Sequence, residues 1–209
     1  MINYETDEER AEAIKKWWKE NGLSIFLGVS IGVGAIFGWR AWIDYRETVR
    51  QQASSAFERL LADADTGDAQ SARTQSKLLR EEFAATAYAP LASLVRARVE
   101  VEAGNLADAR TALEQAIAGS PVLGIRRIAA LRLARVLIAE GDLEGAAGLV
   151  ARHDDGGGFG GAFAALRGEV AEAQGRMADA RAAYEQALTA GAPNTDQVRM
   201  RLDNLPPAS

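Results

Sequence analysis

The sequence predicts an all-α protein in which a single transmembrane helix near the N-terminus is followed by a solenoid of helical hairpins. Three observations predict this fold class. The four tryptophans lie in two pairs at the two ends of an uncharged run over residues 21–39. The chain beyond residue 50 is rich in alanine and carries apolar residues at helical spacing. Turn-like glycines also recur along it, separated by 37 residues (Gly104 to Gly141) and then 34 (Gly141 to Gly175).

The first predicted element is the transmembrane helix, which the tryptophans delimit. Trp17 and Trp18 precede the uncharged run, and Trp39 and Trp42 end it. On a helix that rises ~1.5 Å per residue, Trp18 and Trp39 stand ~32 Å apart, about the thickness of the hydrocarbon core of a bilayer. Because indole rings prefer the headgroup level, the two pairs indicate the two interfaces of one membrane span.

The flanks of this span indicate an uncleaved anchor. The segment before it carries six acidic residues against four basic ones, whereas a signal peptide begins with basic residues and ends at a small-residue cleavage site. The orientation of the anchor stays open from the charges alone. Three lysines lie on the N-terminal side and three arginines on the other, so that the positive-inside rule favours a cytoplasmic N-terminus only slightly.

Four glycines within the span form two GxxxG pairs, Gly28 with Gly32 and Gly34 with Gly38. Small residues at this spacing let a second helix approach closely, so these are candidate residues for packing of membrane helices. Glycine is also common in membrane helices generally, and both interpretations stay open.

The soluble part is predicted to consist of tetratricopeptide-like hairpins, because that repeat has a period near 34 residues. Each of the three glycines would sit at the turn between two helices. A small residue follows five positions later and a larger apolar residue four positions after that. The small residues are Ala109, Ala146 and Ala180, and the larger ones are Leu113, Val150 and Tyr184. A single hairpin cannot bury its apolar face, so the hairpins are expected to stack into one solenoid.

The match to the repeat is uneven. Arg96 and Glu100 fall where larger apolar residues are usual, and Arg167 does so in the last hairpin. Gly67 lies 37 residues before Gly104, which is consistent with a degenerate first repeat.

The concave face of such a solenoid, lined by the first helix of each hairpin, is its expected binding surface. The register set by the glycines puts five charged residues on that face. These candidate partner-binding residues are Arg98, Glu102, Arg135, Glu169 and Glu172. The alternative is that they form an ordinary solvated helix surface.

Composition argues against several classes of function. The formal net charge of −5 disfavours nucleic-acid binding, and the absence of cysteine removes disulfides, thiolate nucleophiles and Cys-ligated metals.

His153 precedes two aspartates at a helix end, where a solvated histidine is far commoner than a catalytic one. The glycine-rich segment 156–161 lacks the Lys-Ser/Thr of a phosphate cradle and is predicted to be a linker, with Phe159 against the solenoid. The acidic segment 63–68 lacks the glutamate that a calcium loop requires at its twelfth position. The sequence therefore predicts no enzyme, no cofactor and no metal.

Several segments carry a resemblance to a known family. They include Glu20-Asn21-Gly22 before the span, Gly32-Val33-Gly34-Ala35 and Gly38-Trp39-Arg40 within it, Leu91-Ala92-Ser93-Leu94, Leu131-Arg132-Leu133-Ala134-Arg135-Val136, and Leu166-Arg167-Gly168-Glu169. On these residues, and over nearly the whole chain, the sequence resembles the YfgM family, the ancillary subunit of the bacterial SecYEG translocon.

The resemblance implies an inner-membrane protein with a cytoplasmic N-terminus. Its partners would be the SecYEG translocon, exported polypeptides and a PpiD-like periplasmic chaperone. The expected organisation is a cytoplasmic tail over 1–20, a transmembrane helix over 21–43, a periplasmic tetratricopeptide-repeat-like domain over 44–205, and a C-terminal tail over 206–209. From the repeats alone, a membrane-anchored envelope scaffold for another complex, such as cell-wall assembly machinery, stays open, because a fold does not fix a function.

Overall fold

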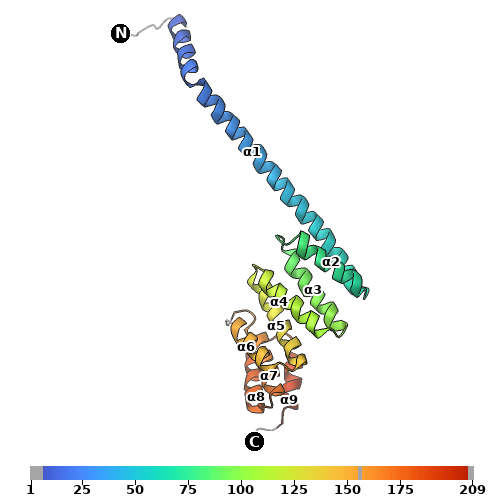
Figure 1. The fold of residues 1–209 in the computed structure, drawn as a ribbon. Helices are drawn as coiled ribbons and strands as arrows, with labels where there is room; N and C mark the ends of the chain where they lie inside the picture. Colours follow the sequence, from blue (N-terminus) through green and yellow to red (C-terminus); the bar gives the residue numbers. More distant parts are fainter. Residues whose placement is uncertain (1–6, 155–156, 207–209) are drawn as a thin grey trace, which may run out of the picture. The chain divides into compact units, whose positions relative to one another are not determined.

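The computed structural model describes residues 7–154 and 157–206, and within them the chain is helical, with no strand (Figure 1). The all-α prediction is therefore confirmed. The chain divides into two compact units, the first ending at Gln51 and the second beginning at Gln52. The helices of the described residues are α1 (Asp7–Asp65), α2 (Ala69–Glu82), α3 (Tyr88–Glu102), α4 (Leu106–Gly119), α5 (Leu123–Glu140), α6 (Leu143–His153), α7 (Gly160–Ala173), α8 (Met177–Thr189) and α9 (Thr195–Asn204).

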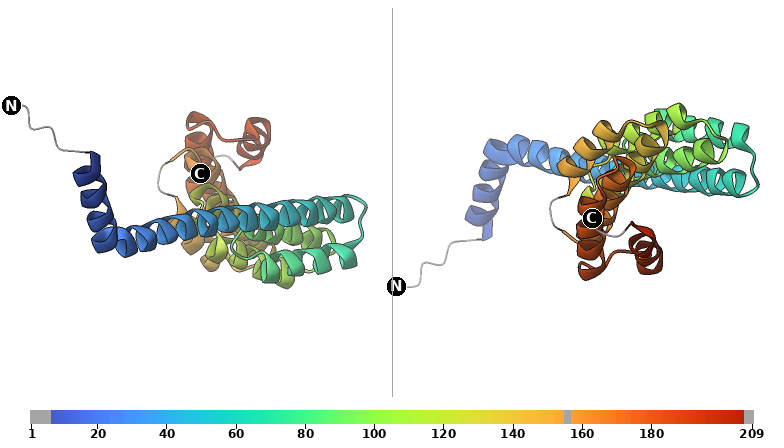
Figure 2. Two further views of the ribbon diagram at one scale, coloured as in Figure 1. Left: turned by 90° about the horizontal axis from the view of Figure 1, so that it is seen from above. Right: turned by 90° about the horizontal axis from the view of Figure 1, so that it is seen from below.

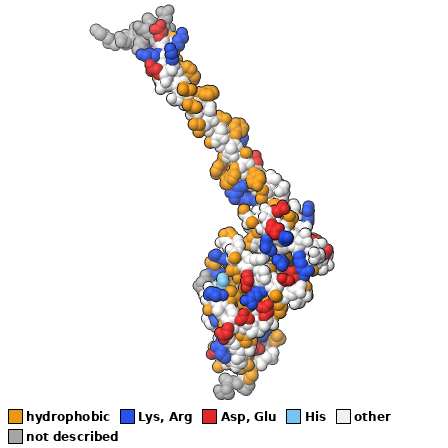
Figure 3. All heavy atoms as spheres, in the orientation of Figure 1, with side chains coloured by type: hydrophobic (Ala, Val, Ile, Leu, Met, Phe, Trp, Pro, Cys, Tyr) orange, Lys and Arg blue, Asp and Glu red, His pale blue; other side chains and the backbone are white. Residues whose placement is uncertain are grey.

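Helix α1 contains the predicted membrane span. By length and composition it could cross a bilayer: its most apolar stretch has a mean hydropathy of 1.8, and none of that stretch is buried within the protein. Large apolar side chains such as Phe26 and Phe37 are 69% and 67% exposed. Apolar side chains cover the middle of α1, whereas charged side chains lie toward its ends (Figure 3). Such exposure is costly in water and is expected of a helix surrounded by lipid.

The helix extends beyond the predicted span on both sides. It begins at Asp7, so residues 7–20 of the predicted tail are helical, whereas residues 1–6 lie outside the described part. It also continues without a break through residues 43 and 44, where the sequence predicted the start of the repeat domain. The reason is that no glycine or proline occurs between residues 39 and 66 to stop it.

The second unit is a stack of helical hairpins (Figure 2). Helices α3 and α4, α5 and α6, and α7 and α8 form three hairpins, and the turn of each contains the predicted glycine. Gly104, Gly141 and Gly175 have φ angles of +78°, +83° and +76°, in the left-handed region that favours glycine. The end of α1 and helix α2 turn in the same way at Gly67, with φ of +78°. These two helices share an apolar cluster with α3, so the degenerate first repeat is also a helical hairpin.

The predicted small and large positions lie in the core of the second unit. Ala109, Ala146 and Ala180 are fully buried, as is Tyr184. Gly168 of α7 lies directly under the ring of Tyr184 from α8, and a Cβ atom at residue 168 would overlap that ring. The two helices of the last hairpin therefore approach closely because one of them lacks a side chain at the contact.

Helix α9 closes the solenoid at its C-terminal end. It packs against α8, and its Val198, together with Leu205 just beyond it, joins the apolar cluster of Tyr184 and Ala187. Terminal elements of a solenoid must cover an apolar face that no further repeat buries. Of the predicted C-terminal tail, Pro206 follows this helix and residues 207–209 lie outside the described part.

The glycine-rich segment is only partly the linker that the sequence predicts. Gly156 lies outside the described residues, but Gly160 and Gly161 are the first residues of α7. A Cβ atom at Gly161 would lie 2.6 Å from the backbone nitrogen of Ala192, so this glycine permits close packing of the helix start. Phe159 is half-buried against the main apolar cluster, as expected.

Candidate partner-binding groove

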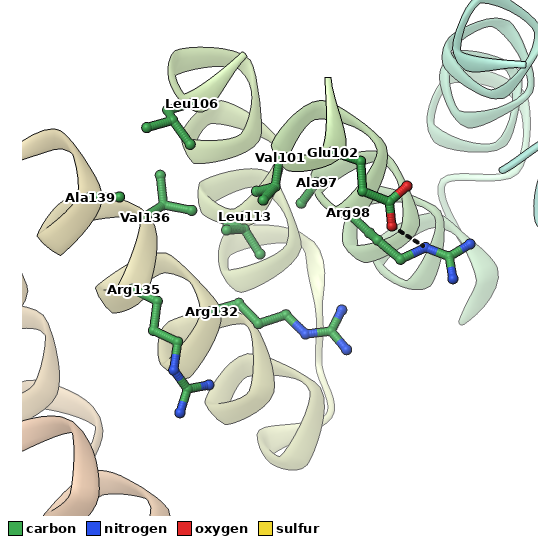
Figure 4. A pocket seen from close by; sticks show the side chains of 10 residues that line it. All are labelled: Ala97, Arg98, Val101, Glu102, Leu106, Leu113, Arg132, Arg135, Val136 and Ala139. Carbon is green, nitrogen blue, oxygen red and sulfur yellow. Dashed lines mark ion pairs between the residues drawn. The ribbon is translucent and has the colours of Figure 1, made fainter. Parts of the chain in front are cut away.

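A groove of about 380 Å³ opens between α3, α4 and α5 of the second unit (Figure 4). Helices α3 and α5 are the first helices of two successive hairpins, which are the helices that the sequence predicted to line the binding face, whereas α4 is a second helix. The residues that line it are Ala97, Arg98, Val101, Glu102, Leu106, Leu113, Arg132, Arg135, Val136 and Ala139.

The floor of the groove is aliphatic. Val101 follows Ala97 by one helical turn, and Ala139 follows Val136 by three residues, so each pair lies on one face of its helix. Leu113 of α4 is 1% exposed and closes the bottom, whereas Val101 is 46% exposed. An aliphatic side chain left this exposed on a packed helix provides apolar surface that a bound side chain could cover.

Three arginines lie along one edge of this floor (Figure 4). Arg98 pairs with Asp65 at 2.8 Å and with Glu102 at 3.9 Å. Arg135 pairs with Glu169 of α7 at 3.5 Å. Arg132 is exposed and, among the described residues, forms no ion pair. Glu102 is the one carboxylate among the lining residues, but Asp65 and Glu169 lie just outside them. Among the described residues, Arg132 is therefore the arginine of this edge whose charge no ion pair compensates.

The five candidate residues do not all meet in one place. Arg98, Glu102 and Arg135 line the groove, and Glu169 adjoins it through its ion pair with Arg135. Glu172 lies elsewhere, on α7 beside the closing helix α9. It accepts hydrogen bonds from the hydroxyl of Tyr184 at 2.6 Å and from Arg201 at 3.1 Å.

The groove also contains residues that the sequence analysis did not select. Arg132 lies three positions before Arg135 and so shares its face of α5. That spacing was available in the sequence. The sequence could not show that Val101 contributes to the groove floor, because this depends on how far apart α3 and α5 lie.

The two ionisable groups with the largest pKa shifts among the described residues, Tyr184 and Glu100, lie away from the groove. Burial, followed by the hydrogen bond to Glu172, raises the pKa of Tyr184, which keeps its hydroxyl protonated as a donor. Burial is also the main cause that lowers the pKa of His153. Among residues 7–154 and 157–206, no cluster of three or more His, Cys, Asp or Glu side chains is placed to hold a metal ion.

Buried Glu100 is the centre of a separate charged network. Two N–H groups of Arg73 donate to its carboxylate at 2.8 Å each, and Asn105 donates at 3.1 Å. These bonds, led by that from Arg73, outweigh burial and lower the pKa of Glu100 to about 2. The network joins α2, α3 and the start of α4, so Glu100 has a structural role.

The glycines of the membrane span have open surroundings. A Cβ atom placed at Gly28, Gly32, Gly34 or Gly38 would meet no other atom of the described chain within 4 Å. Both glycine faces are therefore open to contact with another helix, and no packing contact of the described residues requires glycine there.

Comparison with known protein families identifies the same class of fold as the structure. The family of tetratricopeptide repeat-like domains matches residues 15–207. The protein is thus of the tetratricopeptide repeat-like class, as its hairpins and turn glycines indicate.

Relatives of known name narrow this class. The ancillary SecYEG translocon subunit of Escherichia coli (strain K12) is 30% identical, over 98% of this chain and 99% of its own length. The subunit of the same name from Haemophilus influenzae is 31% identical, over 95% and 97%. That from Aggregatibacter actinomycetemcomitans is 30% identical over the same shares. This chain belongs to the family of ancillary SecYEG translocon subunits, the family that its sequence resembles.

Proposed function

We propose that this protein is an ancillary subunit of the SecYEG translocon that acts as a non-enzymatic protein-interaction module. The observation that carries the proposal is the similarity to three subunits of that name over nearly the whole chain, membrane helix and repeat domain together. In this role the repeat domain links exported polypeptides to a PpiD-like periplasmic chaperone.

The two units have separate tasks in the proposal. The span within α1 holds the protein in the inner membrane, with residues 1–20 in the cytoplasm and the hairpins in the periplasm. Its open glycine faces offer a contact for a membrane helix of the translocon. The groove between α3, α4 and α5 offers a contact for polypeptide. Linking two weak contacts raises the effective concentration for the second, so each alone is expected to bind poorly.

Co-purification tests the proposal. The full chain carries a C-terminal tag at its native expression level, is extracted in mild detergent, and its companions are quantified by mass spectrometry against an untagged strain. The expected result is enrichment of SecYEG subunits together with a periplasmic chaperone. Recovery of translocon subunits at the level of the untagged control would contradict the proposal. Enrichment of cell-wall assembly proteins in their place would support the scaffold alternative.

A further inference from the structure

We propose that the groove between α3, α4 and α5 binds a peptide segment in which one large apolar side chain is flanked by Asp or Glu residues. The proposal rests on the proposed function in taking the repeat domain as the part that binds polypeptide. It adds the chemistry of the segment that is bound and the place where it binds.

The apolar part of this specificity comes from the floor of the groove. Its volume of about 380 Å³ is in the range of ~300–1,000 Å³ that is usual for pockets that enclose a ligand. Val101, Leu106 and Val136 present aliphatic carbon to it, and the small side chain of Ala139 leaves the entrance wide. A leucine or phenylalanine of the peptide would cover the exposed part of Val101 and be removed from water itself.

The acidic part comes from the arginine edge. Arg132 is exposed and has no anionic partner among the described residues. Arg98 and its partner Asp65 are 44% and 68% exposed, and such an exposed pair contributes little to stability, so an incoming carboxylate can replace Asp65 at small cost. The partner of Arg135, Glu169, is only 15% exposed. Arg132 and Arg98 are therefore the arginines that bind the incoming carboxylates. A guanidinium group also binds a carboxylate through two parallel N–H donors, which favours Asp and Glu over neutral polar residues.

The sign of the charge decides against a basic segment. The chain as a whole has a net charge of −5, yet the charge at this edge that no ion pair among the described residues compensates is the positive charge of Arg132. A lysine-rich peptide would be attracted to the molecule at long range but repelled at this edge. An acidic peptide would be repelled by the molecule at long range but attracted at this edge. Its binding therefore depends on the local arginines.

Binding of defined peptides to the full chain tests the proposal. The protein is held in nanodiscs of zwitterionic lipid, and the probe is an amidated, fluorescein-labelled ten-residue peptide with a single phenylalanine between two pairs of aspartates. Fluorescence anisotropy gives its Kd. We expect binding roughly tenfold or more tighter than that of two matched peptides, one with serine in place of the phenylalanine and one with lysines in place of the aspartates. Equal binding of either matched peptide, or no binding of the acidic one, would overturn the proposal.

Substitutions in the protein locate the site. Arg132→Glu reverses the charge of the unpaired guanidinium, and Ala139→Phe fills the groove; each should weaken binding of the acidic peptide by roughly tenfold. Arg59→Glu is the matched control, because Arg59 is also exposed and without an ion pair among the described residues, but lies on α1 and does not line the groove. It changes the net charge by the same amount and should leave the Kd unaltered.

Two results of this comparison would overturn the proposal. The first is equal weakening by Arg132→Glu and Arg59→Glu, which would indicate long-range charge in place of a local contact. The second is unaltered binding by Ala139→Phe in protein whose circular dichroism matches that of the unsubstituted chain. Either result can occur while SecYEG subunits still co-purify, so failure of this proposal is distinguishable from failure of the proposed function.

Discussion

Glu100 shows how much of a residue's role depends on distant parts of the chain. The sequence marks it as a misfit, a carboxylate where the repeat usually has an apolar residue. What the sequence does not contain is the direction from which Arg73, 27 residues earlier on α2, reaches that carboxylate. The side chain of Glu100 is fully buried, and three polar side chains supply its hydrogen bonds and countercharge. Its burial is therefore tolerated because the charge is compensated.

Removing this charge should destabilise the repeat domain. In a soluble fragment that begins near residue 45, Glu100→Gln is expected to lower the free energy of unfolding by about 1–3 kcal/mol. This is less than the cost of breaking a fully buried pair, because Arg73 is 34% exposed and can regain water. Denaturant unfolding followed by circular dichroism measures the change. Glu102→Gln, on the same helix but 61% exposed, is the control and should have little effect, and equal losses for the two variants would contradict the account.

The same carboxylate should make stability depend on pH. Its pKa in the folded protein is about 2, below its ordinary value of 4.5. A carboxylate with a lowered folded pKa contributes stability that is complete above the unfolded pKa and is lost as the pH falls toward the folded one. The difference in unfolding free energy between the unsubstituted fragment and Glu100→Gln should therefore shrink as the pH falls from 6 to 3. A difference that stays constant over this range would show that folding does not lower the pKa of Glu100.

Gly168 tests the close approach of α7 and α8. Gly168→Ala places a methyl group against the ring of Tyr184 and should cost about 1–3 kcal/mol through overpacking. Gly148→Ala is the matched control, since Gly148 is also within a helix but has open space where its Cβ would lie. It should stabilise the fragment by about 0.5–1 kcal/mol, because glycine is a poor helix former. Thermal unfolding of both variants measures the difference, and a Gly168→Ala midpoint at or above that of Gly148→Ala would contradict the packing described.

At the scale of the helices, the sequence predicts those features that depend on residues close together in the chain. The turn glycines and the alanines that follow them predict the three hairpins, because a left-handed backbone and a close helix contact restrict the choice of residue. The predicted boundary at residues 43 and 44 rests on a change of composition, and composition does not end a helix. The role of α9 depends on an exposed face of α8 that only the assembled stack reveals.

The glycine pairs of α1 lead to a prediction about association in the membrane. Gly28→Leu with Gly32→Leu, and Gly34→Leu with Gly38→Leu, would each block close approach of another helix on one face. Neither double substitution should disturb the chain itself, because these positions have open surroundings. One of the two should reduce co-purification of SecYEG subunits, and the other serves as its control. If both leave recovery unaltered while the protein stays in the membrane fraction, the span does not bind through these glycines.

At the scale of the whole molecule, the chain contains an apolar helix and a repeat domain with an apolar, arginine-edged groove. The sequence alone could supply the class of protein and three of the groove's charged residues. It could not supply the groove itself, since that depends on how α3, α4 and α5 pack. The proposed location of the repeat domain in the periplasm depends on the orientation of the span, for which the flanking charges give nearly equal support to both directions.

The natural absence of cysteine makes this orientation directly measurable. Single cysteines are introduced at two exposed positions, Glu12→Cys on the N-terminal side of the span and Ala107→Cys in the repeat domain. Spheroplasts are treated with a membrane-impermeant maleimide before and after lysis. We expect Ala107→Cys to be labelled in intact spheroplasts and Glu12→Cys to be labelled only after lysis. Labelling of Glu12→Cys in intact spheroplasts, with protection of Ala107→Cys until lysis, would place the repeat domain in the cytoplasm and contradict the account.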